Sequence, residues 1–255
     1  MPLSISFDSS STRAALVFSE TPGNIITADL VARLRTALED LIDERHLRLI
    51  TIEGAGADFS FGASVPEHTT EHIGRVLPEM HALVRELLAA PAPTAAVVRG
   101  RCLGGGFELA LACDFIAAAD DATLGLPEIA LGVFPPAGSV LLPVRAGASR
   151  AARAVLTGEA RPAAEWHACG VVELVAPVDG LATAVDAWFD RTLARWSAEA
   201  LRHAVGVVRA PLVDAVTRGL PAVEQIYLDE LMRSRDAVEG IQAFLEKRPP
   251  LWTDE

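Results

Sequence analysis

Positive charge is scarce in this sequence. Its 255 residues include 22 lysines and arginines against 34 aspartates and glutamates, which gives a formal net charge of −12, and Lys247 is the only lysine. Proteins that bind nucleic acid contact the phosphates through clustered cations, so this balance argues against a nucleic-acid partner. It does not argue against an anionic small ligand, which needs only a few local donors.

Cysteine is scarce too, and its spacing excludes a familiar metal motif. Cys102, Cys113 and Cys169 are scattered and odd in number, and no CxxC pair occurs. We expect reduced, mostly buried thiols in a cytoplasmic protein. His68 and His72 have the i, i+4 spacing of a metal pair, but no third ligand is apparent. A charged surface between a loop and a helix is the better interpretation of these two histidines.

Long apolar runs and targeting signals are missing as well. Glycine and proline break the apolar stretches, so none reaches the roughly 20 residues that a membrane-spanning helix needs. The first 20 residues lack a basic start followed by an apolar run, so we expect no signal peptide. The sequence therefore predicts a protein without a membrane partner.

Apolar residues nevertheless make up 51% of the chain, enough for a large core. Apolar positions at helical spacing predict two helices, and Thr27 is a candidate cap of the first. Short β-type runs alternate with these helices, which indicates a mostly parallel sheet and an α/β fold. The expected helices span residues 30–42 and 73–88, and the expected strands span residues 13–18, 49–52, 94–99, 115–119 and 171–175.

The last part of the chain has a different pattern. Between residues 181 and 246 we find only helical periodicity, with interruptions expected near Pro211 and Pro221. We therefore expect an α/β core over residues 1–198 and a C-terminal helical segment over residues 199–255.

The stretch from residue 94 to residue 138 carries the strongest functional signal. A β-type run is followed by the triple glycine at 104–106 and by an apolar helical run that contains Glu108. Glu128 follows Pro127 in a second apolar setting. Glycines let backbone N–H groups approach an anionic oxygen, and two carboxyls in apolar surroundings are candidates for acid–base work. Close helix–strand packing or a dinucleotide-binding turn would also account for the glycines, although the last glycine of G-x-G-x-x-G is absent.

Four segments, in order along the chain, resemble motifs of the crotonase family, the enoyl-CoA hydratase/isomerase superfamily. The resemblance spans nearly the whole chain and implies a spiral of ββα repeats followed by a C-terminal helical segment for oligomerisation and cover of the active site. The segments are FSFGAS at 59–64, GRCLGGGFELALACD at 100–114, LGLPEIALGVFPPAG at 124–138 and EGIQAFLEKRPPLW at 239–252. Residues 22–27, 59–68 and 132–143 are further similar to the branch that hydrates cyclic dienoyl-CoA thioesters.

The resemblance implies roles for particular residues. The N–H groups of Ala63 and Gly105 form an oxyanion hole for the thioester oxygen, and Glu108 and Glu128 are the catalytic pair, with acid and base left unassigned. The family usually has Asp where this chain has Ser64, so the anchoring of that loop is in doubt.

Other residues are candidates for contact with the substrate. Phe59, Phe61, Ser64, Val65 and Phe134 are expected around the acyl or adenine group, although core packing accounts for Phe59 and Phe61 equally well. Lys247 and Arg248 resemble residues that meet the coenzyme A phosphates or adenine. A solvated helix end accounts for these two cations equally well.

The resemblance implies a lyase that adds water to an α,β-unsaturated acyl-CoA, without a metal or a cofactor other than the coenzyme A of the substrate. A homotrimer or a dimer of trimers is expected. An isomerase or decarboxylase of the same fold, a non-catalytic protein that binds coenzyme A or an acyl carrier, and a carrier-protein thioester as substrate remain alternatives.

Overall fold

The computed structural model describes residues 3–20 and 22–255. Met1, Pro2 and Thr21 lie outside the described residues. The predictions made above for the N-terminal stretch and for the 1–198 core are therefore not tested at these three positions. Within the described ranges, no helix is both long and apolar enough to cross a bilayer.

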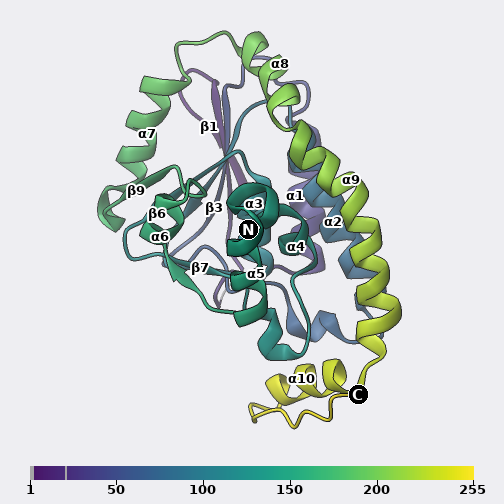
Figure 1. Ribbon diagram of the computed structural model, residues 1–255. Helices are drawn as coiled ribbons and strands as arrows, with labels where there is room; N and C mark the ends of the chain where they lie inside the picture. Colours follow the sequence, from purple (N-terminus) through teal and green to yellow (C-terminus); the bar gives the residue numbers. More distant parts are fainter. Residues whose placement is uncertain (1–2, 21) are drawn as a thin grey trace.

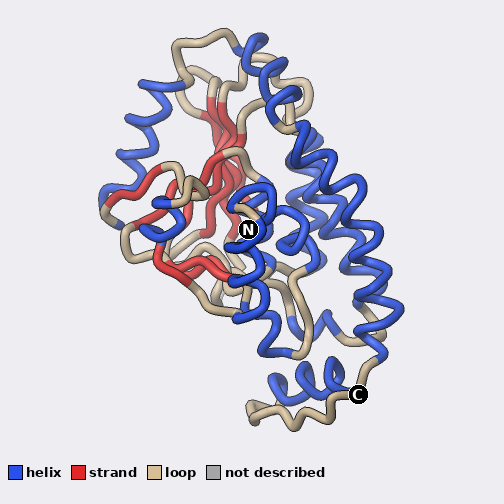
Figure 2. Tube along the Cα trace, viewed as in Figure 1, coloured by secondary structure: helices blue, strands red, loops and turns tan. Residues whose placement is uncertain are grey.

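A six-stranded sheet forms the centre of the protein, in the order β1-β2-β3-β4-β6-β9. Neighbouring strands run parallel except for β1, which pairs antiparallel with β2 at one edge. Figure 2 shows these strands in red, surrounded by helices. The strands are β1 (Leu3–Phe7), β2 (Arg13–Phe18), β3 (Leu49–Gly54), β4 (Thr94–Val98), β6 (Phe115–Ala119) and β9 (Leu174–Ala176).

Four of the five predicted strands are confirmed as β2, β3, β4 and β6. The fifth was placed too early, because the N–H groups of Val171 and Val172 both donate to the carbonyl of Trp166 and close the end of a helix. The edge strand β1 was not predicted. A second sheet was not predicted either; it consists of β5 (Arg101–Leu103), β7 (Thr123–Gly125) and β8 (Arg161–Pro162), which are too short for a visible period.

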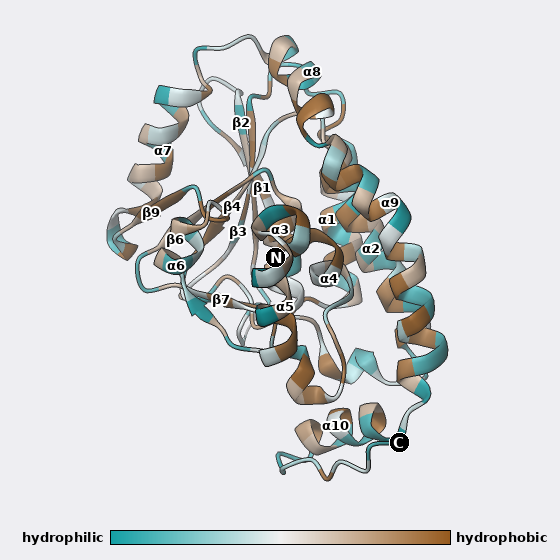
Figure 3. Ribbon diagram, viewed as in Figure 1, coloured by the Kyte–Doolittle hydropathy of each residue, from teal (hydrophilic) through white to brown (hydrophobic). Residues whose placement is uncertain are grey.

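Both predicted helices are present, as α1 (Ala28–Asp40) and α2 (Ile73–Ala89). Thr27 caps α1, since its hydroxyl accepts a hydrogen bond of 3.2 Å from the N–H of Leu30. Helix α9 (Ala210–Gln225) packs beside α2, and the three helices lie side by side along one flank of the molecule (Figure 1). In Figure 3 α9 has both brown and teal positions, whereas β4 and β6 are mostly brown.

The remaining helices surround the sheet. Helix α3 (Gly105–Ala112) is buried at every residue. The others are α4 (Pro136–Ala146), α5 (Ala148–Thr157), α6 (Ala163–Ala168), α7 (Leu181–Thr192), α8 (Ala198–Val208) and α10 (Arg235–Leu245), together with the short turns η1 (Val65–His68), η2 (Pro127–Leu131), η3 (Val178–Gly180), η4 (Ile226–Glu230) and η5 (Leu231–Arg233).

The interruption expected at Pro221 is wrong, because α9 continues through this residue. Val216 and Leu220 on the preceding turns are buried in the core, and this packing holds the helix despite the missing N–H group. Pro211 lies in the first turn of α9, where a proline removes no helical hydrogen bond.

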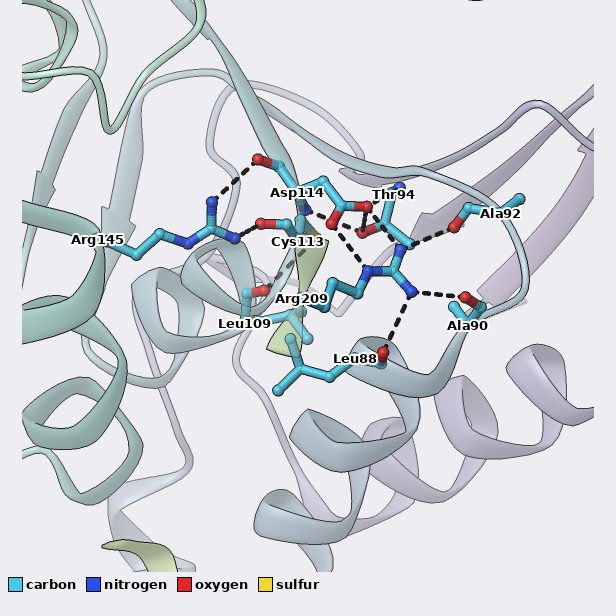
Figure 4. A network of polar contacts seen from close by, with 9 residues as sticks. All are labelled: Leu88, Ala90, Ala92, Thr94, Leu109, Cys113, Asp114, Arg145 and Arg209. Carbon is cyan, nitrogen blue, oxygen red and sulfur yellow. Dashed lines mark hydrogen bonds and ion pairs between the residues drawn. The ribbon is translucent and has the colours of Figure 1, made fainter. Parts of the chain in front are cut away.

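A buried arginine attaches the C-terminal helices to the core. Arg209, between α8 and α9, is 2% exposed, and its guanidinium donates to both carboxylate oxygens of Asp114 at 2.6 and 2.8 Å. It also donates to the carbonyls of Leu88, Ala90 and Ala92 (Figure 4). Asp114 binds Thr94 as well, so one ionic network joins α9, α2 and the start of β4.

The domain boundary at residue 198 stays a prediction.

Candidate active site

A mostly apolar cavity of about 350 Å³ lies between the start of α3, η2, α2 and the C-terminal helices. Its size and lining are typical of a small-molecule site. Ala63 and Gly105 can offer backbone N–H groups to this cavity. Its polar side chains include Glu108, Glu128, His68, Tyr227 and Arg248. The structure therefore brings together both predicted carboxyls and both predicted N–H groups.

Gly104 makes the sharp turn that separates β5 from α3. Its φ of 51° lies in the left-handed region, and a Cβ at this position would lie 2.7 Å from Oε1 of Glu128. Only glycine satisfies both conditions without a shift. The turn thus sets the backbone of α3 directly against the Glu128 carboxyl.

The N–H groups of Ala63 and Gly105 lie at the same edge of the cavity. Ile26 bonds to the carbonyl of Gly62 and to the N–H of Ser64, each at 2.9 Å, so the N–H of Ala63 points away from Ile26. Gly105 opens α3, where first-turn N–H groups have no partner within the helix. A Cβ on Gly105 would lie 3.3 Å from the Ala63 nitrogen, so the two donors are neighbours. Two such donors can bind one anionic oxygen.

Glu108 lies in the first turn of α3 and is buried. Its Oε1 accepts a 2.7 Å hydrogen bond from the N–H of Gly138 in α4. Burial raises the pKa of Glu108 to about 7, an effect partly opposed by the N–H groups of Gly138 and Ala137. A carboxyl with this pKa can both accept and release a proton near neutral pH.

Glu128 lies in η2 with its Oε2 buried and, among the described residues, without a hydrogen-bond partner. Burial raises the pKa of Glu128 well above its ordinary value, and the negative charge of Glu108 raises it further. Because the two carboxyls interact, they titrate as a pair that keeps one proton under conditions where isolated carboxyls would both be ionised. The pair can supply a general base and a general acid at once.

The turn η2 rests on α10. A Cβ on Gly240 would lie 2.1 Å from the carbonyl oxygen of Leu131, and one on Gly132 would lie 2.7 Å from the carbonyl oxygen of Asp236. These backbones are in direct contact, so α10 supports the segment that carries Glu128.

Four of the predicted substrate contacts line the cavity: Phe61, Val65, Phe134 and Arg248. The guanidinium of Arg248 is paired with Glu239, with Nη2 2.8 Å from Oε2, and also with Glu246. Its charge is therefore already balanced within the chain.

Two predicted contacts are corrected by the structure, and a third lies outside this cavity. Phe59 is fully buried in the core, where its ring packs edge-on against Phe18 at 5.4 Å, so core packing accounts for this residue. Ser64 is buried ahead of η1 and does not line the cavity. Lys247 is exposed after α10 and does not line this cavity, so its contact with coenzyme A, which in the family often crosses a subunit boundary, stays a prediction.

The structure adds two residues that the sequence did not place in the site. His68, interpreted as a surface residue, lines the cavity; its Nδ1 lies 2.9 Å from the carbonyl of Ser64, and burial lowers its pKa. The neutral ring thus donates to that carbonyl and steadies the loop after Ala63. Tyr227 of η4 also lines the cavity. His68 ends the 59–68 segment compared above, where the resemblance gave it no role, and no motif includes Tyr227.

His72 is exposed. Within residues 3–20 and 22–255, no group of three or more His, Cys, Asp or Glu side chains is arranged to hold a metal ion.

Comparisons with known proteins agree with this geometry. Residues 14–255 match the family model described as enoyl-CoA hydratase/isomerase. The chain is 42% identical to cyclohexa-1,5-dienecarbonyl-CoA hydratase of Thauera aromatica over 98% of this chain and 96% of the relative. It is 34% identical to 2,3-dehydroadipyl-CoA hydratase of Escherichia coli over 89% of each chain.

Solved structures give the same answer for the fold. An enoyl-CoA hydratase from Mycobacterium avium subsp. paratuberculosis superposes with a TM-score of 0.87 at 29% identity, over 100% of this chain and 99% of that one. The α/β fold expected from the motifs is thus confirmed as the crotonase fold. The chain belongs to the enoyl-CoA hydratase/isomerase family.

Proposed function

We propose that this protein is a hydro-lyase that adds water to an α,β-unsaturated acyl-CoA thioester. The observation that carries the proposal is that Glu108 and Glu128 share one apolar cavity with the neighbouring N–H groups of Ala63 and Gly105. Relatives named as hydratases, at 42% and 34% identity, support it.

The reaction needs three functions from the site. Attack of water on the β-carbon moves the electron pair of the C=C bond towards the thioester, and the oxygen becomes an enolate. The N–H groups of Ala63 and Gly105 form the oxyanion hole, in which one donor contributes typically about 3 kcal/mol of transition-state stabilisation. A carboxylate takes one proton from the attacking water, and a carboxylic acid gives one proton to the α-carbon.

The surroundings of the two carboxyls indicate which of them is the general base and which is the general acid. Glu108 accepts hydrogen bonds from N–H groups, which stabilise its anion, whereas burial and the charge of Glu108 favour the protonated form of Glu128. We infer that Glu108 is the base that activates water and Glu128 the acid that protonates the α-carbon. Because the reaction is redox-neutral and the pair handles both protons, it uses no cofactor beyond the coenzyme A of the substrate.

The acyl group that we propose is a six-membered cyclic diene. Phe134 lines the cavity, and Pro135 and Pro136 follow it and begin α4, so this wall is stiff as well as bulky. The relative from Thauera aromatica carries the name of a cyclic-diene hydratase. A kcat/KM ratio between a cyclic dienoyl-CoA and crotonyl-CoA tests this choice, and one pocket contact changes such ratios by about 10- to 200-fold.

The experiment that tests the reaction class is a product assay. The purified protein is incubated with crotonyl-CoA and with cyclohexa-1,5-diene-1-carbonyl-CoA, and the products are identified by mass spectrometry in water and in H₂¹⁸O. Gain of one water, with the heavy label when it is present, supports hydration. A shifted double bond or loss of carbon dioxide contradicts it, and coenzyme A binding without turnover indicates a non-catalytic protein.

A further inference from the structure

Tyr227 lines the cavity that contains Glu108 and Glu128, and it has no role in the reaction described so far. We propose that its hydroxyl hydrogen-bonds to the oxygen that water contributes to the acyl group, which makes Tyr227 a third polar group at the reacting end of the cavity. This inference rests on the proposed hydratase function and names a residue that recognises its product.

The fold holds the Tyr227 ring in one place. The residue is 1% exposed in η4, and its ring packs edge-on against Phe134 at 5.3 Å with an interplanar angle of 81°. Both rings line the cavity that contains Glu108 and Glu128. A buried ring packed on a stiff wall presents its hydroxyl in a defined direction.

The Tyr227 hydroxyl is left available for a ligand. Among residues 3–20 and 22–255, no side-chain or backbone group is hydrogen-bonded to it, although a buried tyrosine usually finds such a partner. Burial and the charges of Glu108 and Glu128 all raise the pKa of Tyr227, so the phenol keeps its proton and remains a donor. The hydroxyl is thus close enough to respond to both carboxyls but is bonded to neither.

The chemistry of the reaction provides a partner for this donor. The water oxygen loses one proton to a carboxylate and becomes the hydroxyl of the product, which has lone pairs to accept a hydrogen bond. The other polar side chains of the wall are already engaged: the ring of His68 donates to Ser64, and the guanidinium of Arg248 is paired with Glu239 and Glu246. The Tyr227 hydroxyl, a donor in the same cavity as the two carboxyls, therefore binds the hydroxyacyl product and the transition state, and it has no partner in a saturated acyl-CoA.

The test compares Tyr227→Phe with the unaltered protein. Tyr227→Phe keeps the ring packing and removes only the donor. We expect kcat/KM for crotonyl-CoA to fall roughly tenfold, the size of one lost hydrogen bond. In the Glu128→Gln background, where turnover is slow, we expect the affinity for 3-hydroxybutyryl-CoA to fall by a similar factor while that for butyryl-CoA stays unchanged. Equal losses for both ligands would show that Tyr227 acts only through packing and would overturn the proposal.

Phe134→Leu serves as the packing control, because it disturbs the ring contact but keeps the phenol. It should weaken the two ligands to the same extent, so that their affinity ratio is kept. If Phe134→Leu changes this ratio as much as Tyr227→Phe does, the hydroxyl has no specific role.

A spectroscopic readout is available because Tyr227 is the only tyrosine in the chain. Protein grown with 3-fluorotyrosine has a single ¹⁹F resonance. That resonance should shift differently with 3-hydroxybutyryl-CoA and with butyryl-CoA, and identical shifts contradict the proposal. Failure of the unaltered protein to hydrate any enoyl-CoA would instead overturn the proposed function, so the two failures are distinguishable.

Discussion

Glu108 and Glu128 are held in different ways, although they share one cavity. Glu108 is fixed by an N–H donor from α4, whereas Glu128 is fixed by contact with the Gly104 backbone and leaves one oxygen without a partner among the described residues. This difference leads to three predictions at the scale of single residues.

Glu108→Gln and Glu128→Gln should each lower kcat for hydration by about 10²- to 10⁴-fold, because each keeps the size of the side chain and removes proton transfer. Steady-state kinetics on the better of the two test substrates measures the effect. Circular dichroism should show an unchanged fold. A variant that keeps a kcat near that of the unaltered protein would remove that carboxyl from the mechanism.

Glu108→Gln should also change how stability depends on pH. Burial raises the folded-state pKa of Glu108 from 4.5 to about 7, so between these values the folded protein holds a proton that the unfolded chain has released. The stability of the unaltered protein therefore falls as pH rises through this window, and the variant lacks this loss. Its advantage should be on the order of 2 kcal/mol larger at pH 8 than at pH 4.5 in urea unfolding. An equal difference at both pH values contradicts the assignment.

Gly104→Ala should lower kcat by roughly 10²-fold, because the new Cβ displaces Glu128 from its position. Gly170→Ala is the matched control: Gly170 has a similar positive φ of 79°, but nothing lies within 4 Å of the added carbon. Both variants should lose about 1–2 kcal/mol of stability through backbone strain. Only Gly104→Ala should lose activity, and a comparable loss in the control would point to strain alone.

At the scale of helices and strands, the sequence predicted the elements that are long enough to show a hydrophobic period. Helices α1 and α2 and the strands β2, β3, β4 and β6 are among the elements found this way. The strands β5, β7 and β8 have two or three residues each, so their existence depends on pairing between distant segments. The interruption predicted at Pro221 is wrong for a similar reason, since tertiary packing of α9 outweighs the local cost of a proline in the helix.

The attachment of α9 to the core gives a prediction at this scale. Arg209→Ala removes the paired charge of the Asp114 carboxylate and the donor to three carbonyls, which should cost about 3–5 kcal/mol of unfolding free energy. Arg218→Ala on the same helix breaks only an exposed pair with Asp214 and should cost at most about 0.5 kcal/mol. Urea unfolding of both variants makes the comparison. Similar losses would show that the network in Figure 4 is not the main attachment.

For the molecule as a whole, the sequence predicted two carboxyls and two backbone donors that the fold brings into one cavity, but it predicted the other lining residues less reliably. Motifs mark residues such as Glu108 and Gly105, whose type is dictated by the reaction. Phe59 and Phe61 have the same residue type two positions apart, and only the fold decides that one enters the core and the other the cavity. Tyr227 is roughly a hundred residues from Glu128 in the sequence, so no local pattern could predict that it lies in the same cavity.

We propose that the protein assembles as a homotrimer or a dimer of trimers. Val207 and Leu251 are 75% and 76% exposed, and such large apolar side chains favour burial between subunits. Tyr227 and Met232 of the C-terminal segment are buried within the chain and are not available for such an interface. Light scattering at micromolar concentration should give three or six times the mass of one 27.0 kDa chain. A monomer under these conditions contradicts the proposal.

The contact of α10 with η2 also has a consequence for the order of events during synthesis. The ribosome makes Glu108 and Glu128 well before it makes Gly240, whose backbone supports the turn that carries Glu128. A nascent chain that already contains both carboxyls still lacks one wall of its cavity. Chains that are still ribosome-bound, with α10 inside the exit tunnel, should therefore lack hydratase activity, which should appear only after α10 is free to pack against η2.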